Sequence, residues 1–355
     1  MSRADRVAAR LAERGLDLLL VTDMVNVRYL TGFTGSSGLA VVGADTRRFV
    51  TDFRYTEQAR AELDGFDVEP PAPELLRALA GGWPDGDLRV GFEDQHLSVR
   101  RHGELRETLP GRLELVAAGG LVEAERAVKE PAELEAIRAA AALVDEIYAW
   151  LAGFGLVGRT EREVALALEH EMRLRGAEDP SFPSIVAAGE NGALPHAQPR
   201  AVTIPERTLV TLDIGARVDG YCSDCTRTWA TGELDDDLVS LYELVLQAQE
   251  AALSAVRPGP EGREIDAVAR DIITAAGHGE HFGHGLGHGV GLDIHEAPRL
   301  ARTAEGRLAA GNVVTVEPGI YVPGRGGARI EDLVAVTAEG HEMLSHSPKN
   351  LTVVR

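Results

Sequence analysis

Two aspartates in the segment 209–226, LVTLDIGARVDGYCSDCT, have the type and spacing of metal ligands. Asp213 and Asp224 lie on two runs rich in β-branched and apolar residues, on either side of Asp219-Gly220, a pair that favours a tight hairpin turn. Folding about this turn brings the aspartates within a residue or two of facing each other, where Cβ atoms are roughly 4.5–5.5 Å apart. Carboxylates this close repel each other, and a multivalent cation would relieve the repulsion. The alternative is that both are exposed strand residues.

A group of histidines separated by glycines lies in the segment 281–296, HFGHGLGHGVGLDIHE. His284 and His288 are four residues apart in extended sequence, so we expect both side chains on one face. The glycines remove bulk around them, as expected where backbone approaches a ligand closely. A single histidine is usually an ordinary polar residue. Here glycines stand between the histidines where side chains would otherwise pack, so packing alone does not explain the segment. We therefore interpret the segment as part of a binding site.

Two glutamates and a further histidine lie in apolar surroundings. Glu317 ends the apolar run VVTVE, and Glu331 lies between apolar runs in ARIEDLVAV. A buried carboxylate is costly unless it is paired or ligated. The alternative for each is a buried ion pair, with Arg329 the obvious partner of Glu331. Pro195-His196 lies in a loop too apolar to be a simple solvated linker.

Composition narrows the class of protein. A chain of 355 residues with 44% hydrophobic and 26% charged residues is typical of a globular protein large enough for two domains. A net charge of −20 argues against nucleic acid or an anionic membrane as the main partner. No apolar run approaches the ~20 residues that span a bilayer, and the N-terminus is amphipathic rather than signal-like, so we expect a cytoplasmic protein. Cys222 and Cys225 have CxxC spacing but no second pair for zinc, and we interpret them as incidental buried thiols.

The elements that must position these residues fall into two parts. Strand-like runs alternate with helical ones in the first third, which predicts a small α/β domain over 1–124; the stretch 26–38 is expected to be a loop. Charge rises at 123–131, and from there to 355 a second domain is expected. Its helices begin with Pro131 in a first turn and with a capping box at Thr160–Glu163, and two later helices precede glycine-punctuated strands.

The combined set of two aspartates, one histidine and two glutamates suits a pair of divalent ions. The sequence resembles the pita-bread metallopeptidases, a superfamily that includes methionine aminopeptidase, aminopeptidase P, prolidase and the metal-free creatinase. The resemblance is carried by HGLGHGVGLDIHE, by EPGIY and by the order Asp213, Asp224, His288, Glu317, Glu331. NVRYLTGFTGSSG and TDFRY resemble the creatinase/prolidase-type N-terminal domain, which makes methionine aminopeptidase the poorer match. All five ligand positions are filled, which argues against creatinase and against non-catalytic relatives.

The resemblance implies an α/β N-terminal domain over 1–124 and an α+β pita-bread catalytic domain over 125–355, in which helices cover a curved antiparallel sheet. It also implies two divalent ions, most often Mn²⁺, with Co²⁺ or Zn²⁺ as alternatives. Asp213 would hold one ion and His288 with Glu317 the other, while Asp224 and Glu331 would bridge them. Carboxylate-rich ligation with one imidazole suits Mn²⁺ better than thiolate-seeking metals.

The implied reaction is hydrolysis of an Xaa-Pro bond by a hydroxide held between the two ions, with Glu317 carrying its proton toward the leaving nitrogen. His196 and His295 would stabilise the oxyanion, and His284 would line the proline side. Arg329 would orient the carboxylates or the substrate. The substrate-binding positions implied by the resemblance are His196, His284, His295, Tyr321 and Arg329.

We expect an aminopeptidase P-like enzyme that releases the first residue of peptides beginning Xaa-Pro, because TGFTGSSG and TDFRY look more like aminopeptidase P than prolidase. The alternative is prolidase, which uses the same metal site but cleaves only Xaa-Pro dipeptides. A remote alternative is a non-catalytic peptide-binding relative. The Xaa-Pro amide has no N–H and a ring that fixes φ, so it needs a dedicated pocket. The expected partners are a proline-containing peptide and, from the resemblance, a second copy in a homodimer.

Overall fold

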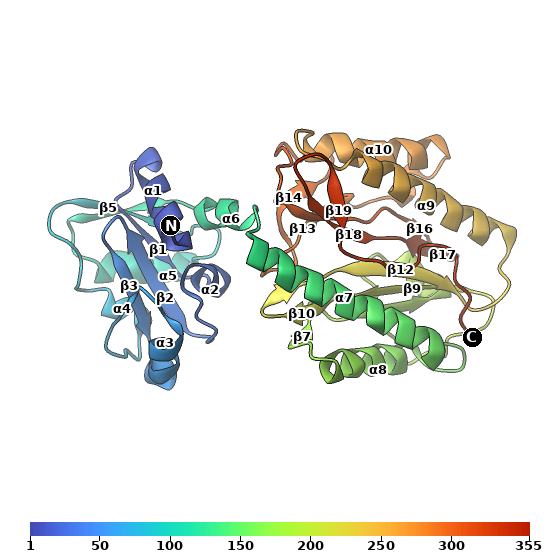
Figure 1. Ribbon diagram of the computed structural model, residues 1–355, viewed down its shortest axis with the longest axis horizontal. Coiled ribbons are helices and arrows are strands. Elements are labelled where there is room, and N and C mark those ends of the chain that lie inside the picture. The colour runs from blue at the N-terminus through green and yellow to red at the C-terminus, as the bar shows by residue number, and fades with distance from the viewer. The chain divides into compact units, whose positions relative to one another are not determined.

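The computed structural model describes residues 1–355, which form two compact units, Met1–Arg126 and Ala127–Arg355 (Figure 1). The sequence prediction placed the boundary between residues 124 and 125. No helix in either unit combines the length and the apolar character that a membrane crossing requires. Each unit has its own sheets and its own apolar core, so each is described by itself.

The N-terminal unit is built on a six-stranded mixed sheet in the order β4-β3-β2-β1-β5-β6. Pairings β1–β5, β5–β6 and β3–β4 are parallel, and β1–β2 and β2–β3 are antiparallel. The strands are β1 (Leu18–Val21), β2 (Gly38–Gly43), β3 (Arg47–Thr51), β4 (Asp67–Val68), β5 (Leu88–Phe92) and β6 (Leu113–Ala117). The helices are α1 (Arg3–Leu11), α2 (Met24–Thr31), α3 (Thr56–Glu62), α4 (Leu75–Ala78), α5 (Val99–Thr108) and α6 (Leu121–Arg126). The α/β prediction for this unit is confirmed.

The first part of the segment 26–38, expected to be a loop, is helical, and that prediction was wrong. Helix α2 begins after Asp23, whose carboxylate accepts a hydrogen bond from the Val25 N–H, and ends at Gly32, where φ is 80°. An aspartate N-cap and a glycine in the left-handed region are ordinary helix boundaries. Asp23 precedes residue 26, so the segment 26–38 does not include this cap. The serines and glycines that follow Gly32 give the segment a loop-like composition.

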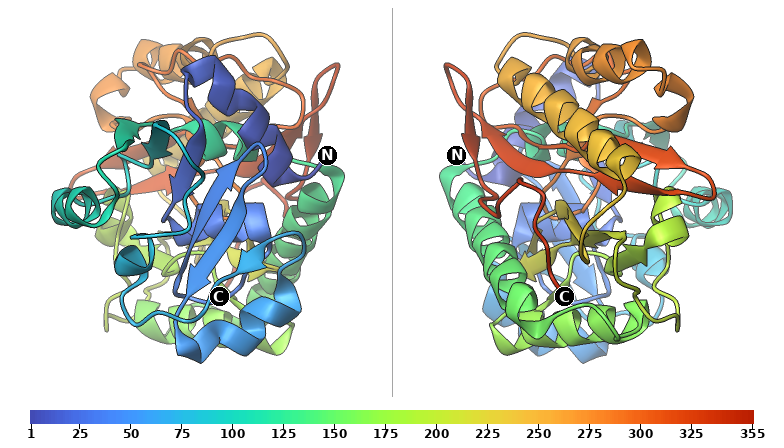
Figure 2. Two further views of the ribbon diagram at one scale, coloured as in Figure 1. Left: turned by 90° about the vertical axis from the view of Figure 1, so that its left-hand side faces the viewer. Right: turned by 90° about the vertical axis from the view of Figure 1, so that its right-hand side faces the viewer.

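The C-terminal unit places antiparallel strands between two pairs of helices (Figure 1; Figure 2, right). The helices are α7 (Pro131–Phe154), α8 (Glu161–Leu174), α9 (Asp236–Ala255) and α10 (Gly262–Ala275). The first pair packs on the sheet β12-β9-β8. The second pair packs on the strands of the sheet β14-β13-β15-β18-β19 and on β16 (Gly319–Val322) and β17 (Gly326–Arg329). The strands of these two larger sheets are β8 (Ile185–Ala188), β9 (Leu209–Ile214), β12 (Cys225–Ala230), β13 (Gly287–Gly289), β14 (Glu296–Leu300), β15 (Val313–Val316), β18 (Asp332–Val336) and β19 (His341–Met343).

Two smaller sheets complete the C-terminal unit. They are β11-β10-β7 and the pair β16-β17, with the strands β7 (Asp179–Pro180), β10 (Ala216–Val218), β11 (Tyr221–Cys222), β16 (Gly319–Val322) and β17 (Gly326–Arg329). All strand pairings in this unit are antiparallel. The predicted α+β architecture, with helices covering antiparallel strands, is confirmed, and hydrogen bonding divides the strands among several sheets.

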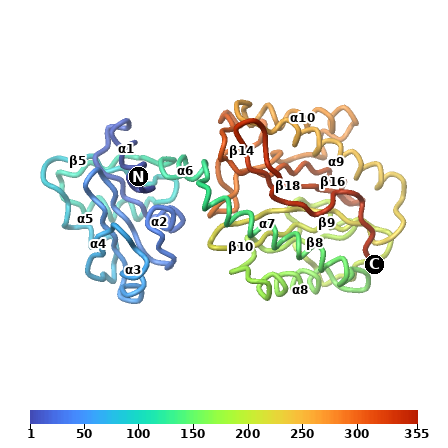
Figure 3. Tube along the Cα trace, viewed as in Figure 1, coloured from blue at the N-terminus to red at the C-terminus, as the bar shows by residue number.

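Local sequence signals explain the helix ends in this unit. Pro131 occupies the first turn of α7, and Thr160 caps α8 in a reciprocal capping box with Glu163. Helix α7 buries residues at helical spacing, including Val144, Ile147 and Leu151, against the sheet of β8, β9 and β12. The C-terminus of the chain lies beside the C-terminal end of α7, as the trace in Figure 3 shows. There the Leu156 N–H donates to the Arg355 carbonyl.

The hairpin that carries the two aspartates forms as expected. Asp219 and Gly220 have φ values of 50° and 82°, which suit a two-residue turn between β10 and β11. The chain bends at Gly215, where a Cβ would collide with the Ser223 carbonyl. Beyond the bend β9 and β12 pair with Asp213 opposite Thr226, so Asp224 lies two residues from direct opposition.

Candidate metal centre

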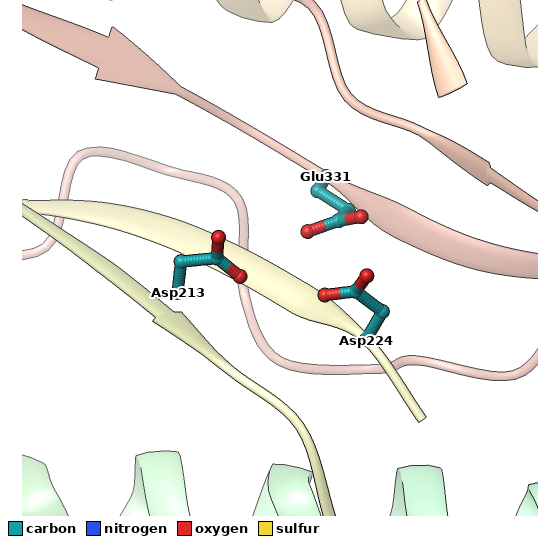
Figure 4. A group of neighbouring side chains, drawn as sticks. All are labelled: Asp213, Asp224 and Glu331. Atoms are coloured by element: carbon teal, nitrogen blue, oxygen red, sulfur yellow. The ribbon is translucent and has the colours of Figure 1, made fainter. Parts of the chain in front are cut away.

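Five carboxylate and imidazole side chains from separate strand ends meet in the C-terminal unit. Asp213 lies near the end of β9, Asp224 directly precedes β12, and Glu331 directly precedes β18. Their ligand oxygens all lie within 4.8 Å of one another, and Figure 4 shows the three carboxylates pointing toward a common centre. His288 Nε2 lies 3.6 Å from Asp224 Oδ2 and 3.3 Å from Glu317 Oε1, which joins the remaining two side chains to the cluster.

The carboxylates of this cluster are only partly compensated within the chain. Asp213 Oδ1 and Glu331 Oε1 are buried and have no hydrogen-bond partner. Burial and the neighbouring carboxylates raise the pKa of Asp224 and of Glu331 well above the usual range, and burial raises the pKa of Glu317 to about 8. Buried polar atoms are nearly always satisfied, so unpaired oxygens at this density fit hard divalent cations. The donor set therefore fits the pair of ions that the resemblance implied.

The histidine of the cluster is held in the form that can coordinate a metal. His288 Nδ1 donates to the Gly289 carbonyl at 3.0 Å, which leaves the Nε2 lone pair facing the carboxylates. Burial, together with the nearby His295, lowers the pKa of His288 to about 4, so the ring is neutral at pH 7. Thr315 Oγ1 accepts from the His288 N–H and donates to Glu317 Oε1, linking the two side chains.

Arg329 connects several parts of the site. Its Nη2 donates to Asp213 Oδ2 at 2.7 Å, its Nη1 donates to Tyr321 Oη at 2.8 Å, and its Nε donates to Thr226 Oγ1 at 3.0 Å. Thr226 Oγ1 in turn donates to Glu331 Oε2 at 2.7 Å. The alternative reading of Glu331, a direct ion pair with Arg329, is therefore not what the structure shows. The guanidinium pairs with Asp213 and reaches Glu331 only through the threonine hydroxyl.

His284 lies apart from the carboxylates. Its Nδ1 donates to the Gly285 carbonyl at 2.7 Å, and its Nε2 accepts from Tyr321 Oη at 2.9 Å. Burial and the Arg329 charge lower the pKa of His284 to about 4. Strand β13 covers only Gly287–Gly289, so His284 lies outside the strand that carries His288, and the two rings have different partners.

His196 and His295 are the most accessible of the predicted site residues. Neither side chain makes a hydrogen bond within the chain, and both residues are exposed. The His295 ring packs edge-on against the His288 ring, with centroids 4.3 Å apart. Burial is the main cause that lowers the pKa of His295, and the charge of His196 lowers it further. His196 follows Pro195, whose carbonyl accepts from Arg329 Nη1 at 3.1 Å.

Sequence reasoning missed the threonines that support the site. Thr226 connects Arg329 with Glu331, and Thr228 Oγ1 exchanges hydrogen bonds with the Arg329 backbone N–H and carbonyl. The available signal was strand periodicity, because Asp224, Thr226 and Thr228 are spaced by two residues and share one face of a strand. The nearby Cys222 and Cys225 are free and buried, and burial raises the pKa of both thiols, as suits inert packing residues.

These features define a metal-dependent hydrolase with a separate N-terminal unit. Residues 135–338 match the metallopeptidase family M24, and residues 3–128 match the creatinase/prolidase N-terminal domain. The chain belongs to metallopeptidase family M24. The predicted family, two-domain fold and enzyme class are thereby confirmed.

Relatives and solved structures cover nearly the whole chain. It is 41% identical to an uncharacterized peptidase of Bacillus subtilis, over 96% of each chain, and 32% identical to the Xaa-Pro dipeptidase of Pyrococcus furiosus, over 98% of this chain and 99% of that one. The structure of the Xaa-Pro dipeptidase from Bacillus anthracis superposes with a TM-score of 0.94 at 39% identity, over 99% of each chain. That of the X-Pro aminopeptidase from Thermotoga maritima gives 0.88 at 34% identity, over 97% of this chain and 99% of that one.

Proposed function

We propose that this protein hydrolyses the Xaa-Pro bond and prefers Xaa-Pro dipeptides. The observation that carries the proposal is the buried cluster of four carboxylates and one neutral imidazole, in which Asp213 and Glu331 each leave an oxygen unpaired. Several relatives that span the chain are named Xaa-Pro dipeptidase, which supports the choice of bond.

The residues that would hold two divalent ions are Asp213, Asp224, His288, Glu317 and Glu331. When bound, the ions would supply Lewis acidity and lower the pKa of water enough to yield a nucleophile at neutral pH. Arg329 keeps Asp213 oriented, and Thr226 does the same for Glu331. Glu317, with its pKa raised to about 8, suits a group that takes a proton during attack and passes it to the leaving proline nitrogen.

The histidines outside the carboxylate cluster would act on the substrate. His196 and His295 have no hydrogen-bond partner in the chain, so their ring N–H groups are free to donate to the substrate carbonyl oxygen as it gains negative charge. His284 is already held by Tyr321, which in turn accepts from Arg329. This fixed, neutral ring would shape the side of the pocket that receives the proline ring.

Substrate length separates the two candidate activities. The sequence motifs favoured an aminopeptidase P-like enzyme, and the Thermotoga maritima relative is named X-Pro aminopeptidase. The names of the curated relatives favour the dipeptidase alternative instead. The test is kcat/KM for Ala-Pro, Ala-Pro-Ala and the control Ala-Ala in one Mn²⁺ buffer. We expect Ala-Pro to be preferred over Ala-Pro-Ala by more than about tenfold, or about 1.4 kcal/mol of transition-state binding. Equal or faster turnover of the tripeptide would restore the aminopeptidase P-like reading.

The metal, the quaternary state and the location stay predictions: Mn²⁺ rather than Co²⁺ or Zn²⁺, and a homodimer in the cytoplasm. Chelated protein reloaded with each metal alone, followed by activity and elemental analysis, identifies the metal. Light scattering on the eluting protein gives its mass. A reloaded protein that binds Ala-Pro without cleaving it would indicate the non-catalytic peptide-binding alternative.

A further inference from the structure

A buried ion pair lies directly beside the loop that carries His295. Lys129 Nζ lies 3.0 Å from Glu296 Oε2, and the two side chains are only 1% and 5% exposed. Glu296 is the residue that follows His295 in the chain, whereas Lys129 belongs to the segment that precedes α7. The pair thus joins the start of the C-terminal unit to the first residue of β14, 167 residues further along, where the loop that carries His295 ends.

The Glu296 carboxylate also organises the loop itself. Its Oε1 accepts from the Asp293 N–H at 3.0 Å, so it binds the backbone two residues before His295. Gly291 leaves room for this carboxylate, because a Cβ there would lie 2.6 Å from Glu296 Oε2. The Gly291 carbonyl accepts from the Cys222 N–H at 2.8 Å, which fixes the start of the loop against β11. His295 therefore lies between Asp293 and Glu296, which are connected by the hydrogen bond from the Asp293 N–H to the Glu296 carboxylate.

The cation of the pair is held in a fixed place. The Lys129 N–H donates to the Gly311 carbonyl at 2.8 Å, and Asn312 Nδ2 donates to the Ala127 carbonyl at 2.8 Å. Lys129 is one of only two lysines in a chain with 36 basic residues, and the other, Lys349, also pairs with a buried carboxylate. An ammonium is a compact point charge, and the planar fork of an arginine has a different shape and reach.

Stability alone does not explain this pair. The desolvation of two buried charges offsets most of their attraction, and apolar replacements of similar volume are often as stable. His295, in contrast, has no hydrogen bond of its own and touches the cluster through the His288 ring. Its location is therefore set by the backbone on either side of it, which Glu296 and Lys129 hold.

We propose that Lys129 and Glu296 are positioning residues that hold the His295 imidazole over the metal cluster for the reacting carbonyl. The inference rests on the proposed function, in which His295 contacts the substrate. Neither residue contacts the substrate; Lys129 acts through Glu296, and Glu296 acts through the loop backbone. Loss of the pair should lower kcat more than it raises KM, because the interaction lost is one made in the transition state.

A double-mutant cycle with Lys129→Met and His295→Ala tests the coupling. In the otherwise native enzyme, Lys129→Met should lower kcat about 10–100-fold, the usual effect of losing a residue that orients a site group. In the His295→Ala background the same substitution should change kcat less than about twofold, because the group that it positions is gone. Mn²⁺ affinity, measured by titration of the chelated protein, should be nearly unchanged in all variants, since neither Lys129 nor His295 is one of the five proposed ligands.

Lys349→Met is the matched control, because it removes the other lysine and also leaves a buried carboxylate short of a cation. Whatever its effect on kcat, that effect should be the same with and without His295. A Lys129→Met effect that is equally large in both backgrounds would overturn the inference and leave the proposed function intact. A His295→Ala enzyme with native kcat would instead remove His295 from the proposed function, so the two failures are distinguishable.

The double replacement Lys129→Met/Glu296→Met separates positioning from folding. It removes both charges, so the unfolding temperature should recover toward the native value relative to Lys129→Met alone. The kcat defect should persist, since no carboxylate remains to bind the Asp293 N–H. Recovery of kcat together with stability would show that the pair is only structural.

Discussion

Glu331 and Asp332 are neighbours in the chain and are both buried, yet their surroundings are opposite. Asp332 Oδ1 accepts from Arg227 Nη2 at 2.8 Å, and its Oδ2 accepts from Lys349 Nζ at 2.7 Å and from Gln249 Nε2 at 2.9 Å. Glu331 has one side-chain hydrogen bond, from Thr226 to Oε2, and its Oε1 has none. One carboxylate is fully compensated by the chain and the other is not.

The two pKa shifts follow from this difference. Burial raises the pKa of both groups, but Arg227 and Lys349 outweigh it and lower the pKa of Asp332 below its usual value. At Glu331 burial is reinforced by Glu317 and Asp213, and the pKa rises well above the usual range. A buried carboxylate that the chain itself neutralises is structural, whereas one left unpaired is a candidate for an external cation.

Replacing Glu331 should produce the largest change. Glu331→Gln keeps the shape but removes the charge, so we expect Mn²⁺ affinity and activity to fall by more than about 100-fold, the upper end for residues that only support a ligand. The metal-free protein should unfold at an equal or higher temperature than the native one, since an unpaired buried charge has gone. Elemental analysis and calorimetry measure both. Native metal content would exclude Glu331 from the site.

Replacing Asp332 should have the opposite effect, lowering stability while leaving metal binding intact. Asp332→Asn leaves Arg227 and Lys349 buried against a neutral group, so the free energy of unfolding should fall by about 3–5 kcal/mol. Metal stoichiometry should be retained wherever the protein remains folded. Urea denaturation of the chelated protein, run beside Glu331→Gln, gives the comparison. A stability loss below about 1 kcal/mol, the level of a surface pair, would contradict it.

The pH dependence of stability should also distinguish the two kinds of carboxylate. The pKa of Glu317 is about 8 in the folded, metal-free chain, against an ordinary value of 4.5. Between these values the folded state binds more protons than the unfolded state, so the free energy of unfolding should decrease as pH rises from 4.5 through 8. The lowered pKa of Asp332 acts in the opposite sense, with stability lost as pH falls below 3.8. Denaturation midpoints across this range, with Glu317→Gln as the comparison, should show the neutral-to-alkaline slope reduced in the variant.

The smallest effect is expected at a compensated pair on the surface. Arg138 Nη2 lies 2.8 Å from Glu342 Oε2, and both side chains are substantially exposed. Solvent screens such a pair, so Arg138→Ala should change the free energy of unfolding by only about 0–1 kcal/mol and leave metal content unchanged. A loss of stability comparable to that of Asp332→Asn would show that burial does not account for the difference between the Arg138–Glu342 pair and the ion pairs of Asp332.

Features set by neighbouring residues could be predicted from the sequence. The turn at Asp219-Gly220 depends on residues that tolerate positive φ, and the start of α8 depends on the capping box of Thr160 and Glu163. The family resemblance also pointed to the residues that cluster, because their order along the chain is recognisable without coordinates. Local reasoning was wrong at 26–38, where the cap at Asp23 lay outside the segment considered.

Only the tertiary structure decided which charges are compensated. From the letters, Arg329 was the obvious partner of Glu331, yet it pairs with Asp213. Nothing in the sequence indicated that Lys129 meets Glu296 or that Arg227 meets Asp332. These pairings join residues more than 100 positions apart, so they depend on how whole strands and helices pack. The sequence therefore identified the residue types that can bind a metal. The unpaired oxygens that distinguish a ligand from a structural carboxylate exist only once the chain has folded.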